Sequence, residues 1–462
     1  MKKIRCLEPS KRASKQGSRA RALSFAMTTA CLCMIVRDEA HVLAETLTTV
    51  FRAMPCVTTF VIADTGSVDD TKAVIAATTA ALGVTGHVVD QPWVDFGTNR
   101  TQMLAAAREL TADTADYLFL WDADDTMRLP GDTTQGIVPL PTPLTSDVYR
   151  FMFESGTGTA RPIQYVRPVL VTNRRPWRYV GVLHEYLEVA DDGPEPSAVT
   201  VHVPGLVFVS RQLGARSRAE DKFRRDADTL RAALAKADPP PPPRLKYRYK
   251  FYLGYALKDA GDQAGAIAAF KDLVDDPEAH VHSWAQERYM ACLFLGRMLW
   301  ATGDPAGAVF YWLRACHLVP DRLETIQELV NLFAFHGEND VAYSLSKLAA
   351  SAAGTAGTAH LFLDETTATF YLPYSMVYVC AHTGRFDEAV AHFRTLFAHR
   401  HVGPAWHLDN LFTHLKYVPE GALDAGPYWA AVRRQAPDYQ PSPSARAGLA
   451  RAGVTVEFAA AP

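Results

Sequence analysis

Short apolar runs alternate with longer amphipathic segments between residues 31 and 121. The apolar runs are rich in β-branched or aromatic side chains and predict four strands, at residues 31–36, 57–63, 84–90 and 117–121. The amphipathic segments have the length and spacing of helices, at residues 39–53, 71–82 and 98–110. Strands that alternate with helices in this way form βαβ units, so we expect a parallel sheet with right-handed crossovers.

A run of five prolines at residues 239–243 separates an α/β domain, residues 27–238, from a segment of different amino-acid composition. Because a polyproline run cannot continue a helix and forms a stiff connector, we place the domain boundary there. The following sequence is rich in alanine and aromatic residues, which predicts an all-helical domain over residues 244–440. Residues 441–462 begin with Pro-Ser-Pro-Ser, and we expect them to form a flexible tail.

The predicted helical domain contains an internal repeat. Four glycines are each followed five residues later by an alanine, in the pairs Gly261 and Ala266, Gly303 and Ala308, Gly337 and Ala342, and Gly384 and Ala389. One interval between these glycines is 34 residues, the period of a tetratricopeptide repeat, and the other two are 42 and 47. Glycine suits a tight turn between paired helices, and alanine lets the helices approach closely. We therefore expect an irregular, tetratricopeptide-like (TPR-like) solenoid, with a plain helical bundle as the alternative.

The charge balance gives no sign of a nucleic-acid-binding or membrane-binding protein. The chain has 462 residues, with 47 Lys and Arg against 50 Asp and Glu, a net charge of −3. No stretch approaches the roughly 20 continuous apolar residues of a membrane-spanning helix. Residues 1–26 are different, because they carry eight basic residues and one acid without the apolar run of a secretory signal. We expect a disordered extension there, with a transit-like or surface-binding tail as the alternative.

The cysteines are few, odd in number and mostly embedded in apolar runs, at Cys6, Cys31, Cys33, Cys56, Cys292, Cys316 and Cys380. This pattern predicts buried thiols and favours a reducing, cytoplasmic compartment. Cys31 and Cys33 share one face of a predicted strand, but no further ligands for a metal lie nearby in the sequence.

Acidic residues gather directly after the predicted strands, which is where open parallel sheets bind their ligands. Asp122 and Asp124 follow the fourth strand two residues apart, so their carboxylates would repel one another unless a cation relieved the repulsion. Mg²⁺ and Mn²⁺ prefer such oxygens and commonly bridge them to a diphosphate. The alternative is an acidic turn or helix cap, because two aspartates at this spacing are frequent by chance.

Four blocks in sequence resemble the family 2 glycosyltransferases, which have the GT-A fold and transfer a sugar from a nucleoside-diphosphate sugar. The blocks are CLCMIVRDE from Cys31 to Glu39, VIADTGSVDDT from Val61 to Thr71, WVDFGTNR from Trp93 to Arg100, and DAD from Asp122 to Asp124. Asp38 stands where the family usually has asparagine. The resemblance implies a Rossmann-like mixed sheet and favours UDP as the nucleotide.

The resemblance also implies that Asp64 contacts the nucleoside base. A carboxylate there can accept from a ring N–H of a pyrimidine. A metal on Asp122 and Asp124 would neutralise the charge that grows on the leaving diphosphate, and Arg100 is either a second cation there or a surface arginine. We expect the donor to be contacted by Arg37, Glu39, Asp64, Ser67, Asp69, Arg100, Asp122, Arg216 and Lys222.

A second region, WRYVGVLHE from Trp177 to Glu185, resembles a W-R-Y-x-G-x-x-H-E block of one subgroup of the family. Displacement with inversion at an anomeric carbon needs a carboxylate that takes the acceptor proton. We expect this base to be Glu185, with Asp125 as the second candidate, and His184 to be a metal ligand or phosphate contact. The alternative is that His184 and Glu185 straddle a strand and have no chemical role.

The segment from Gly214 through Lys222 resembles the G-x-R-S…K stretch that follows this block in the subgroup. Cations such as Arg216 and Lys222 at a helix start are suited to grip a diphosphate. The family often has a histidine shortly before this stretch, where Ser210 and Arg211 stand here, which leaves a histidine ligand from that position in doubt.

The sequence thus predicts an inverting glycosyltransferase of hexosyltransferase type that depends on Mn²⁺ or Mg²⁺. Its acceptor would be a glycan or a polypeptide held by the helical repeats, which are also suited to self-association as a homo-oligomer. One rival is a nucleotidyltransferase, which would usually carry a glycine-rich loop where Arg37, Asp38 and Glu39 stand. The other rival is an inactive TPR-like scaffold, against which the intact carboxylates argue.

Overall fold

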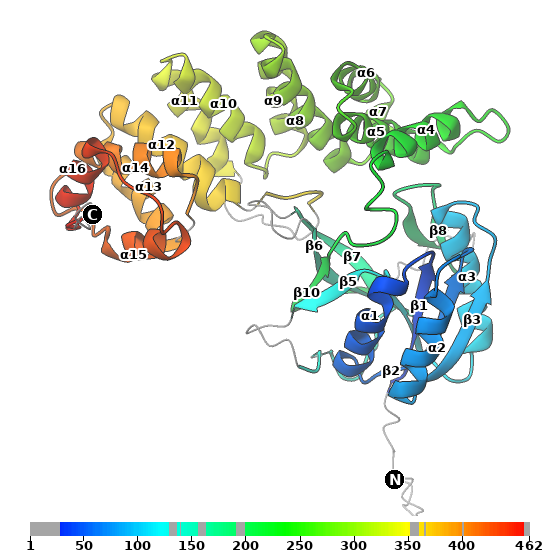
Figure 1. Cartoon of the computed structure of the whole chain (residues 1–462). Helices are drawn as coiled ribbons and strands as arrows, with labels where there is room; N and C mark the ends of the chain where they lie inside the picture. The colour runs from blue at the N-terminus through cyan, green and yellow to red at the C-terminus, as the bar shows by residue number, and fades with distance from the viewer. Residues whose placement is uncertain are drawn as a thin grey trace, which may run out of the picture.

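The computed structural model describes residues 28–128, 136–138, 140–155, 163–190, 199–351, 360–364, 366–399 and 402–456. The basic extension expected at residues 1–26 lies outside these residues. The described chain forms an α/β region up to residue 210 and a helical region after it (Figure 1).

The α/β region begins with the seven strands and helices that the sequence predicts. They are β1 (Ala30–Val36), α1 (Ala40–Ala53), β2 (Val57–Asp64), α2 (Thr71–Leu82), β3 (Thr85–Asp90), α3 (Phe96–Leu110) and β4 (Tyr117–Leu120). Only their end residues differ from the expected bounds. The β-branched runs therefore identified the parallel strands correctly.

The strands form one mixed eight-stranded sheet in the order β3-β2-β1-β4-β7-β6-β10-β5. Its later strands are β5 (Asp125–Arg128), β6 (Val148–Ser155), β7 (Ile163–Thr172) and β10 (Thr200–Ser210). Strands β1 to β4 are parallel, whereas β7 and β5 run antiparallel to their neighbours. The mixed sheet confirms the expected fold class, and it brings the carboxyl ends of β1, β2 and β4 to one edge. A separate hairpin consists of β8 (Trp177–Val180) and β9 (Tyr186–Val189).

Helices cover both faces of this sheet. Alternate residues of β1 point to opposite faces, so Leu32 and Met34 pack in the core with α1, whereas Cys31 and Cys33 pack with Met103 of α3. The parallel strands are thus buried on both sides, which explains their continuous apolar runs.

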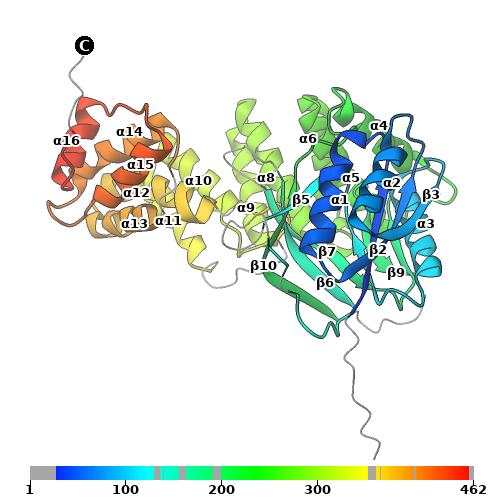
Figure 2. The same cartoon turned by 60° about the horizontal axis from the view of Figure 1, so that its bottom comes forward.

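The helical region is an elongated array in Figures 1 and 2, with its first helices against the α/β region and its last at the far end. Its helices are α4 (Lys222–Ala235), α5 (Pro243–Asp259), α6 (Gln263–Val274), α7 (Ala279–His282), α8 (Ala285–Ala301), α9 (Pro305–Leu318), α10 (Glu324–Phe335), α11 (Asn339–Ser346), α12 (Leu372–His382), α13 (Phe386–His399), α14 (Ala405–His414), α15 (Gly426–Gln435) and α16 (Pro443–Arg451). Short helical turns lie at Lys347–Ser351, Thr367–Tyr371 and Leu415–Tyr417.

The glycine and alanine repeat has the structural meaning that its spacing predicts. The glycines lie in the turns between paired helices with φ of 79°, 84°, 80° and 72°, at Gly261, Gly303, Gly337 and Gly384. The paired alanines are at most 1% exposed, at Ala266, Ala308, Ala342 and Ala389. Each repeat therefore uses glycine for the left-handed turn and alanine for close packing, as in a TPR-like array.

The polyproline segment does not separate two independently packed domains. Pro243 is the first residue of α5, and the helix before the prolines, α4, packs in the same core as α5 through Ala227 and Leu230. Leu183, from the β8–β9 turn, also belongs to this core. The boundary expected at residues 239–243 therefore lies inside the helical packing, because apolar residues before the prolines complete that core.

The flexible tail expected from residue 441 is also corrected. Ser442 caps α16 by accepting a hydrogen bond from the Ala445 backbone N–H at 3.2 Å, and Pro443 occupies its first turn. Leu449 is fully buried in the core of the last helices. The Pro-Ser-Pro sequence is thus a helix start, and residues 457–462 lie outside the described chain.

The cysteines of the described chain are free, and four of them are buried, at Cys31, Cys33, Cys292 and Cys380. Burial raises the pKa of the Cys292 thiol to about 12, so it remains a thiol. Cys6 lies outside the described residues. In the described part of the chain, no helix combines the length and apolar character that crossing a membrane requires.

Candidate active site

Asp64 ends β2 at the carboxyl edge of the parallel strands. Its Oδ1 accepts hydrogen bonds from the backbone N–H groups of Gly66 and Ser67, both at 2.9 Å. Its Oδ2 is buried and has no hydrogen-bond partner among the described residues. A buried carboxylate oxygen without a donor is costly, so this atom is suited to receive a donor from a ligand.

The turns after β1 and β2 are joined to each other. The Ser67 hydroxyl accepts from the Asp38 backbone N–H at 3.0 Å, and Asp69 accepts from the backbone N–H groups of Ala40 and Thr71 at 3.2 and 2.9 Å. Both carboxylate oxygens of Asp69 are therefore used in holding the starts of α1 and α2. A donor contact from Ser67 or Asp69 stays a prediction, as does one from Arg37, whose side chain is 54% exposed.

Arg100 connects two of the sequence blocks. It lies in α3, and its Nη2 donates to Asp122 Oδ1 at 2.6 Å. Its Nε lies 2.8 Å from Glu185 Oε1, an ion pair whose N–H direction is not that of a hydrogen bond. One guanidinium thus brings the end of β4 and the β8–β9 turn together, and Arg100 is not a surface arginine.

A second arginine, Arg167 of β7, completes this group. Its Nη2 donates to Asp122 Oδ2 at 3.1 Å, and its Nη1 lies 4.0 Å from Asp125 Oδ2. The guanidinium also lies over the Phe153 ring, 4.3 Å from its centroid. Arg100, Arg167, Asp122, Asp125 and Glu185 form what we call the carboxylate cluster.

The two aspartates of this cluster have opposite protonation tendencies. Burial alone would raise the pKa of Asp122, but Arg100 and Arg167 together hold it well below its ordinary value. Burial, followed by the negative charge of Asp122, raises the pKa of Asp125 well above its ordinary value, and Arg167 offsets this only partly. Asp122 is therefore an anion and Asp125 favours its protonated form.

Asp124 lies at the rim of the cluster, under the segment that follows β10. The Gly214 backbone N–H donates to Asp124 Oδ2 at 2.9 Å, and the Ala215 backbone N–H donates to Glu39 Oε1 at 3.1 Å. Burial raises the pKa of Glu39, whose Oε2 has no partner among the described residues. Arg211 donates to the Asp124 backbone oxygen at 3.0 Å, so it fixes the loop that carries Asp124.

The basic segment predicted to grip a diphosphate lies beside Asp124. Arg216 pairs with Asp226 of α4, and its guanidinium lies 4.7 Å from the centroid of the Phe96 ring. Burial, followed by the charge of Arg216, lowers the pKa of Lys222. Two cations that repel one another at the rim of a carboxylate group are suited to an anionic ligand.

His184 lies in a turn and not on a strand, with φ of 53° between β8 and β9. Its ring stacks on Tyr252 of α5, with centroids 3.8 Å apart and planes 9° apart. Burial, followed by the positive charges of Arg248, Arg216 and Lys222, lowers its pKa to about 3.

The expected metal set of Asp122, Asp124 and His184 is not assembled. In the described part of the chain, no three His, Cys, Asp or Glu residues are close enough to hold a metal together. Asp122 has an arginine on each oxygen, and His184 is stacked on Tyr252 and surrounded by cations. Asp124 is the member of the set that fits a divalent cation, because its Oδ1 has no protein partner among the described residues and phosphate oxygens can complete such a site.

An open cleft of about 340 Å³ lies beside the β8–β9 turn. It is lined by the start of α3, by Tyr179 of β8, by Val182 and by Tyr249 of α5. Tyr179 also lies under the Arg100 guanidinium, 5.5 Å from ring centroid to Cζ, so the cleft adjoins the carboxylate cluster.

Comparison with known proteins agrees with this geometry. Residues 31–129, which contain β1 to β4 and both aspartates of the D-x-D block, match the family described as Glycosyl transferase family 2. The chain carries a family 2 glycosyltransferase domain. Residues 289–309 and 374–395 match the tetratricopeptide repeat family, and they contain Gly303 and Gly384 of the glycine repeat.

One curated protein with repeats in its name is similar to most of this chain. A TPR repeat-containing protein of Synechococcus elongatus is 28% identical over 344 residues, which is 72% of this chain and 77% of that protein. Among solved structures, MamA is 20% identical with a TM-score of 0.28 and covers 39% of this chain and 85% of its own. A tetratricopeptide repeat protein from Parabacteroides merdae is 11% identical with a TM-score of 0.33 and covers 50% of this chain and 78% of its own.

The candidate site contains one partly buried residue that the sequence blocks did not reveal. Arg167 lies in the apolar run of β7, between Val166 and Pro168. An arginine inside an otherwise apolar strand requires a buried partner, and that was the available signal. The contacts that α5 makes with the β8–β9 turn had no local signal, because they join segments about 65 residues apart.

Proposed function

We propose that this protein is an inverting glycosyltransferase that moves a sugar from a UDP-sugar to an acceptor held beside the helical repeats. The observation that carries the proposal is the contact of Arg100 with both Asp122 and Glu185. It joins three separated sequence blocks in one cluster at the carboxyl edge of the sheet. Arg100 and Asp122 lie within the residues that match the family 2 glycosyltransferases, and Glu185 follows that match along the chain.

The nucleotide would lie over the ends of β1 and β2. The unpartnered Oδ2 of Asp64 supports uracil among the pyrimidines, because uracil has a ring N–H to donate and neutral cytosine has a bare ring nitrogen. Arg216 and Lys222 would contact the diphosphate. Asp124 would hold a Mg²⁺ or Mn²⁺ ion together with phosphate oxygens, and the ion would supply positive charge to the leaving group.

Glu185 is the carboxylate that we assign to the acceptor proton. Its side chain is 12% exposed, whereas that of Asp125 is 2% exposed and favours the protonated form. A base must be ionised and must reach the acceptor nucleophile, which favours Glu185. Arg100 would hold Glu185 in place while direct displacement inverts the anomeric carbon.

The acceptor is a polypeptide or a glycan in this proposal. TPR repeats are protein-interaction elements, which supports a polypeptide bound by the helical region. The free cysteines of the described chain support a reducing, cytoplasmic compartment.

The test is a panel of nucleoside-diphosphate sugars with and without Mn²⁺, read as donor hydrolysis and as a shift in melting temperature. We expect UDP with Mn²⁺ to stabilise the wild type and Asp124→Asn to abolish that stabilisation. Glu185→Gln should keep the stabilisation and lose turnover. Asp228→Asn, an exposed carboxylate of α4, is the matched control.

The outcomes separate the proposal from its rivals. If no nucleotide stabilises the protein and no donor is cleaved, the scaffold alternative replaces the proposal. Release of inorganic pyrophosphate from a nucleoside triphosphate would indicate the nucleotidyltransferase. If Glu185→Gln kept full turnover, the base would have to be another carboxylate.

A further inference from the structure

Helix α5, which belongs to the helical region, contacts the turn that carries Glu185. The Tyr249 hydroxyl accepts from the Val182 backbone N–H at 2.9 Å. Arg248 Nε donates to the His184 backbone oxygen at 2.8 Å, and Tyr252 stacks on the His184 ring. Three residues of α5, at positions 248, 249 and 252, therefore contact Val182 and His184 of the turn.

This turn has a backbone that needs external support. Gly181 has φ of 117° and His184 has φ of 53°, a left-handed conformation that costs free energy for a residue with a side chain. On its other side the turn lies against α3, where a Cβ at position Gly97 would collide with the Gly181 backbone oxygen. The turn is thus clamped between a helix of the glycosyltransferase domain and a helix of the repeats.

Helix α5 is itself fixed within the repeats. Arg248 pairs with Glu287 of α8, whose side chain is 3% exposed. Tyr249 is 2% exposed and Tyr252 is 4% exposed. A buried ion pair with two buried aromatic rings leaves α5 little freedom to shift relative to α8.

We propose that Arg248, Tyr249 and Tyr252 are positioning residues for Glu185, so that the helical region completes the glycosyltransferase site. This inference rests on the proposed role of Glu185. The repeats then contribute to catalysis directly and are more than a surface for an acceptor. Because small displacements of a reacting group cost large factors in rate, loosening the turn should lower kcat more than it changes KM for the donor.

The test is Tyr249→Phe, which removes one oxygen atom and keeps the buried ring. Its matched control is Tyr247→Phe, two residues earlier in α5. Tyr247 is also buried, at 3% exposed, and its hydroxyl donates to Asp276 within the repeats at 2.9 Å. Both variants lose one hydroxyl contact of equal length, but only Tyr249→Phe loses one to the Glu185 turn.

Two readouts are measured for each variant. We expect Tyr249→Phe to lower kcat about tenfold with donor KM within about twofold, since one hydrogen bond that orders a reacting group is lost. Amide hydrogen exchange at residues 182–184 should speed up in Tyr249→Phe and stay at the wild-type rate in Tyr247→Phe. Melting temperatures should fall by similar amounts in the two variants.

The exchange measurement keeps this inference separate from the proposed function. If the wild type turns over no donor, the proposed function fails, and the exchange rates alone decide whether α5 holds the turn. Wild-type exchange and wild-type kcat in Tyr249→Phe would overturn the inference. Equal effects of the two variants on exchange and kcat would overturn it as well, because they would indicate general loosening of α5.

Discussion

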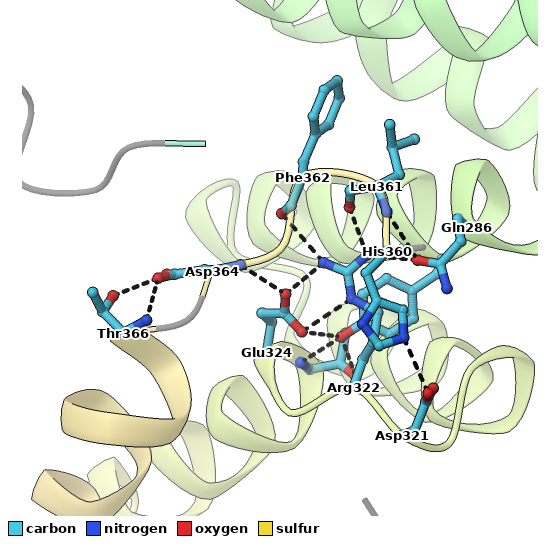
Figure 3. A network of polar contacts seen from close by, with 11 residues as sticks. Gln286, Asp321, Arg322, Glu324, His360, Leu361, Phe362, Asp364 and Thr366 are labelled. Carbon is cyan, nitrogen blue, oxygen red and sulfur yellow. Dashed lines mark hydrogen bonds and ion pairs between the residues drawn. The ribbon is translucent and has the colours of Figure 1, made fainter. Parts of the chain in front are cut away.

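Each region of the molecule contains a cluster of arginines and carboxylates, and the two clusters serve different purposes. In the helical region, Arg322 is 1% exposed and donates all five of its N–H groups (Figure 3). The acceptors are both carboxylate oxygens of Glu324, the Gln286 side chain, and the backbone oxygens of Leu361 and Phe362. One guanidinium pairs with one carboxylate, and each of its N–H groups has an acceptor.

The carboxylate cluster of the glycosyltransferase domain is arranged differently. Two arginines meet three carboxylates, and Asp125 Oδ2 is buried without a hydrogen-bond partner among the described residues. The side chain of Asp122 is also 26% exposed, whereas that of Arg322 is 0% exposed. A saturated group stabilises a fold, whereas a group with more carboxyl groups than cations and an open side is suited to a ligand or a proton.

The largest effect should come from breaking the saturated group. Arg322→Ala leaves the buried Glu324 carboxylate without its cation and removes a donor from the backbone oxygens of Leu361 and Phe362, so we expect about 3–5 kcal/mol less free energy of unfolding. Urea denaturation measures this loss. The double variant Arg322→Met with Glu324→Leu should recover much of it, and a single variant that loses under about 1 kcal/mol would contradict the assignment.

The second effect should appear in activity and not in stability. Lysine cannot span two carboxylates as a guanidinium does, so Arg100→Lys should lower kcat about 100-fold with a small change in melting temperature. Steady-state donor hydrolysis measures this change. Arg297→Lys, at an ion pair of α8 with Glu328, is the control and should keep wild-type turnover. If Arg100→Lys had the same kcat as the wild type, Arg100 would have no role in the reaction.

A third, smaller effect concerns Asp125 and pH. Its raised pKa means that the folded protein keeps a proton that the unfolded chain releases above about pH 4, so this group costs stability as pH rises toward the folded pKa. Asp125→Asn cannot ionise and should be more stable than the wild type at pH 8, by about 1.4 kcal/mol for each unit of pKa shift.

Denaturation at pH 4, 6 and 8 tests the sign of this effect. The difference between Asp125→Asn and the wild type should shrink toward zero at pH 4, where both carry no charge at this position. Asp228→Asn, at an exposed pair, should show no such trend. A less stable Asp125→Asn at pH 8 would mean that the ionised form is favoured in the folded protein.

The saturated and unsaturated groups also differ in how well the sequence predicts them. The D-x-D aspartates, Arg100 and Glu185 lie in blocks with recognisable spacing, and the structure brings Asp122, Arg100 and Glu185 together. Regular local patterns likewise identified the first seven strands and helices and the glycine turns of the repeats. Arg167 and the Arg322 network were missed, because their partners come from distant segments that no local pattern connects.

The wrong boundaries have a common physical reason. The prolines at 239–243 and at 441 and 443 were interpreted as breaks in structure, but a proline is also favoured in the first turn of a helix. Pro243 and Pro443 both start helices whose apolar faces complete a core. Whether a proline ends an element or starts a helix depends on whether the residues after it are buried.

The smallest expected effect concerns His184 and the cations that lie around it at the candidate site. Burial and the cations Arg248, Arg216 and Lys222 lower the pKa of His184 to about 3. Below about pH 6.5 His184 is protonated in the unfolded chain but stays neutral in the folded protein. This histidine therefore lowers the free energy of unfolding as pH falls from 6.5 toward 3.

Binding of UDP should partly reverse that shift. A diphosphate on Arg216 and Lys222 cancels positive charge that faces His184, so saturating UDP should raise the pKa of this imidazole. Histidine resonances followed by NMR against pH, with and without UDP, measure the change. Lys222→Met should reduce the response to UDP, since it removes one of the cations that the diphosphate neutralises. An imidazole that titrates identically with and without bound UDP would place the diphosphate away from Arg216 and Lys222, and these cations would then serve the fold and not the donor.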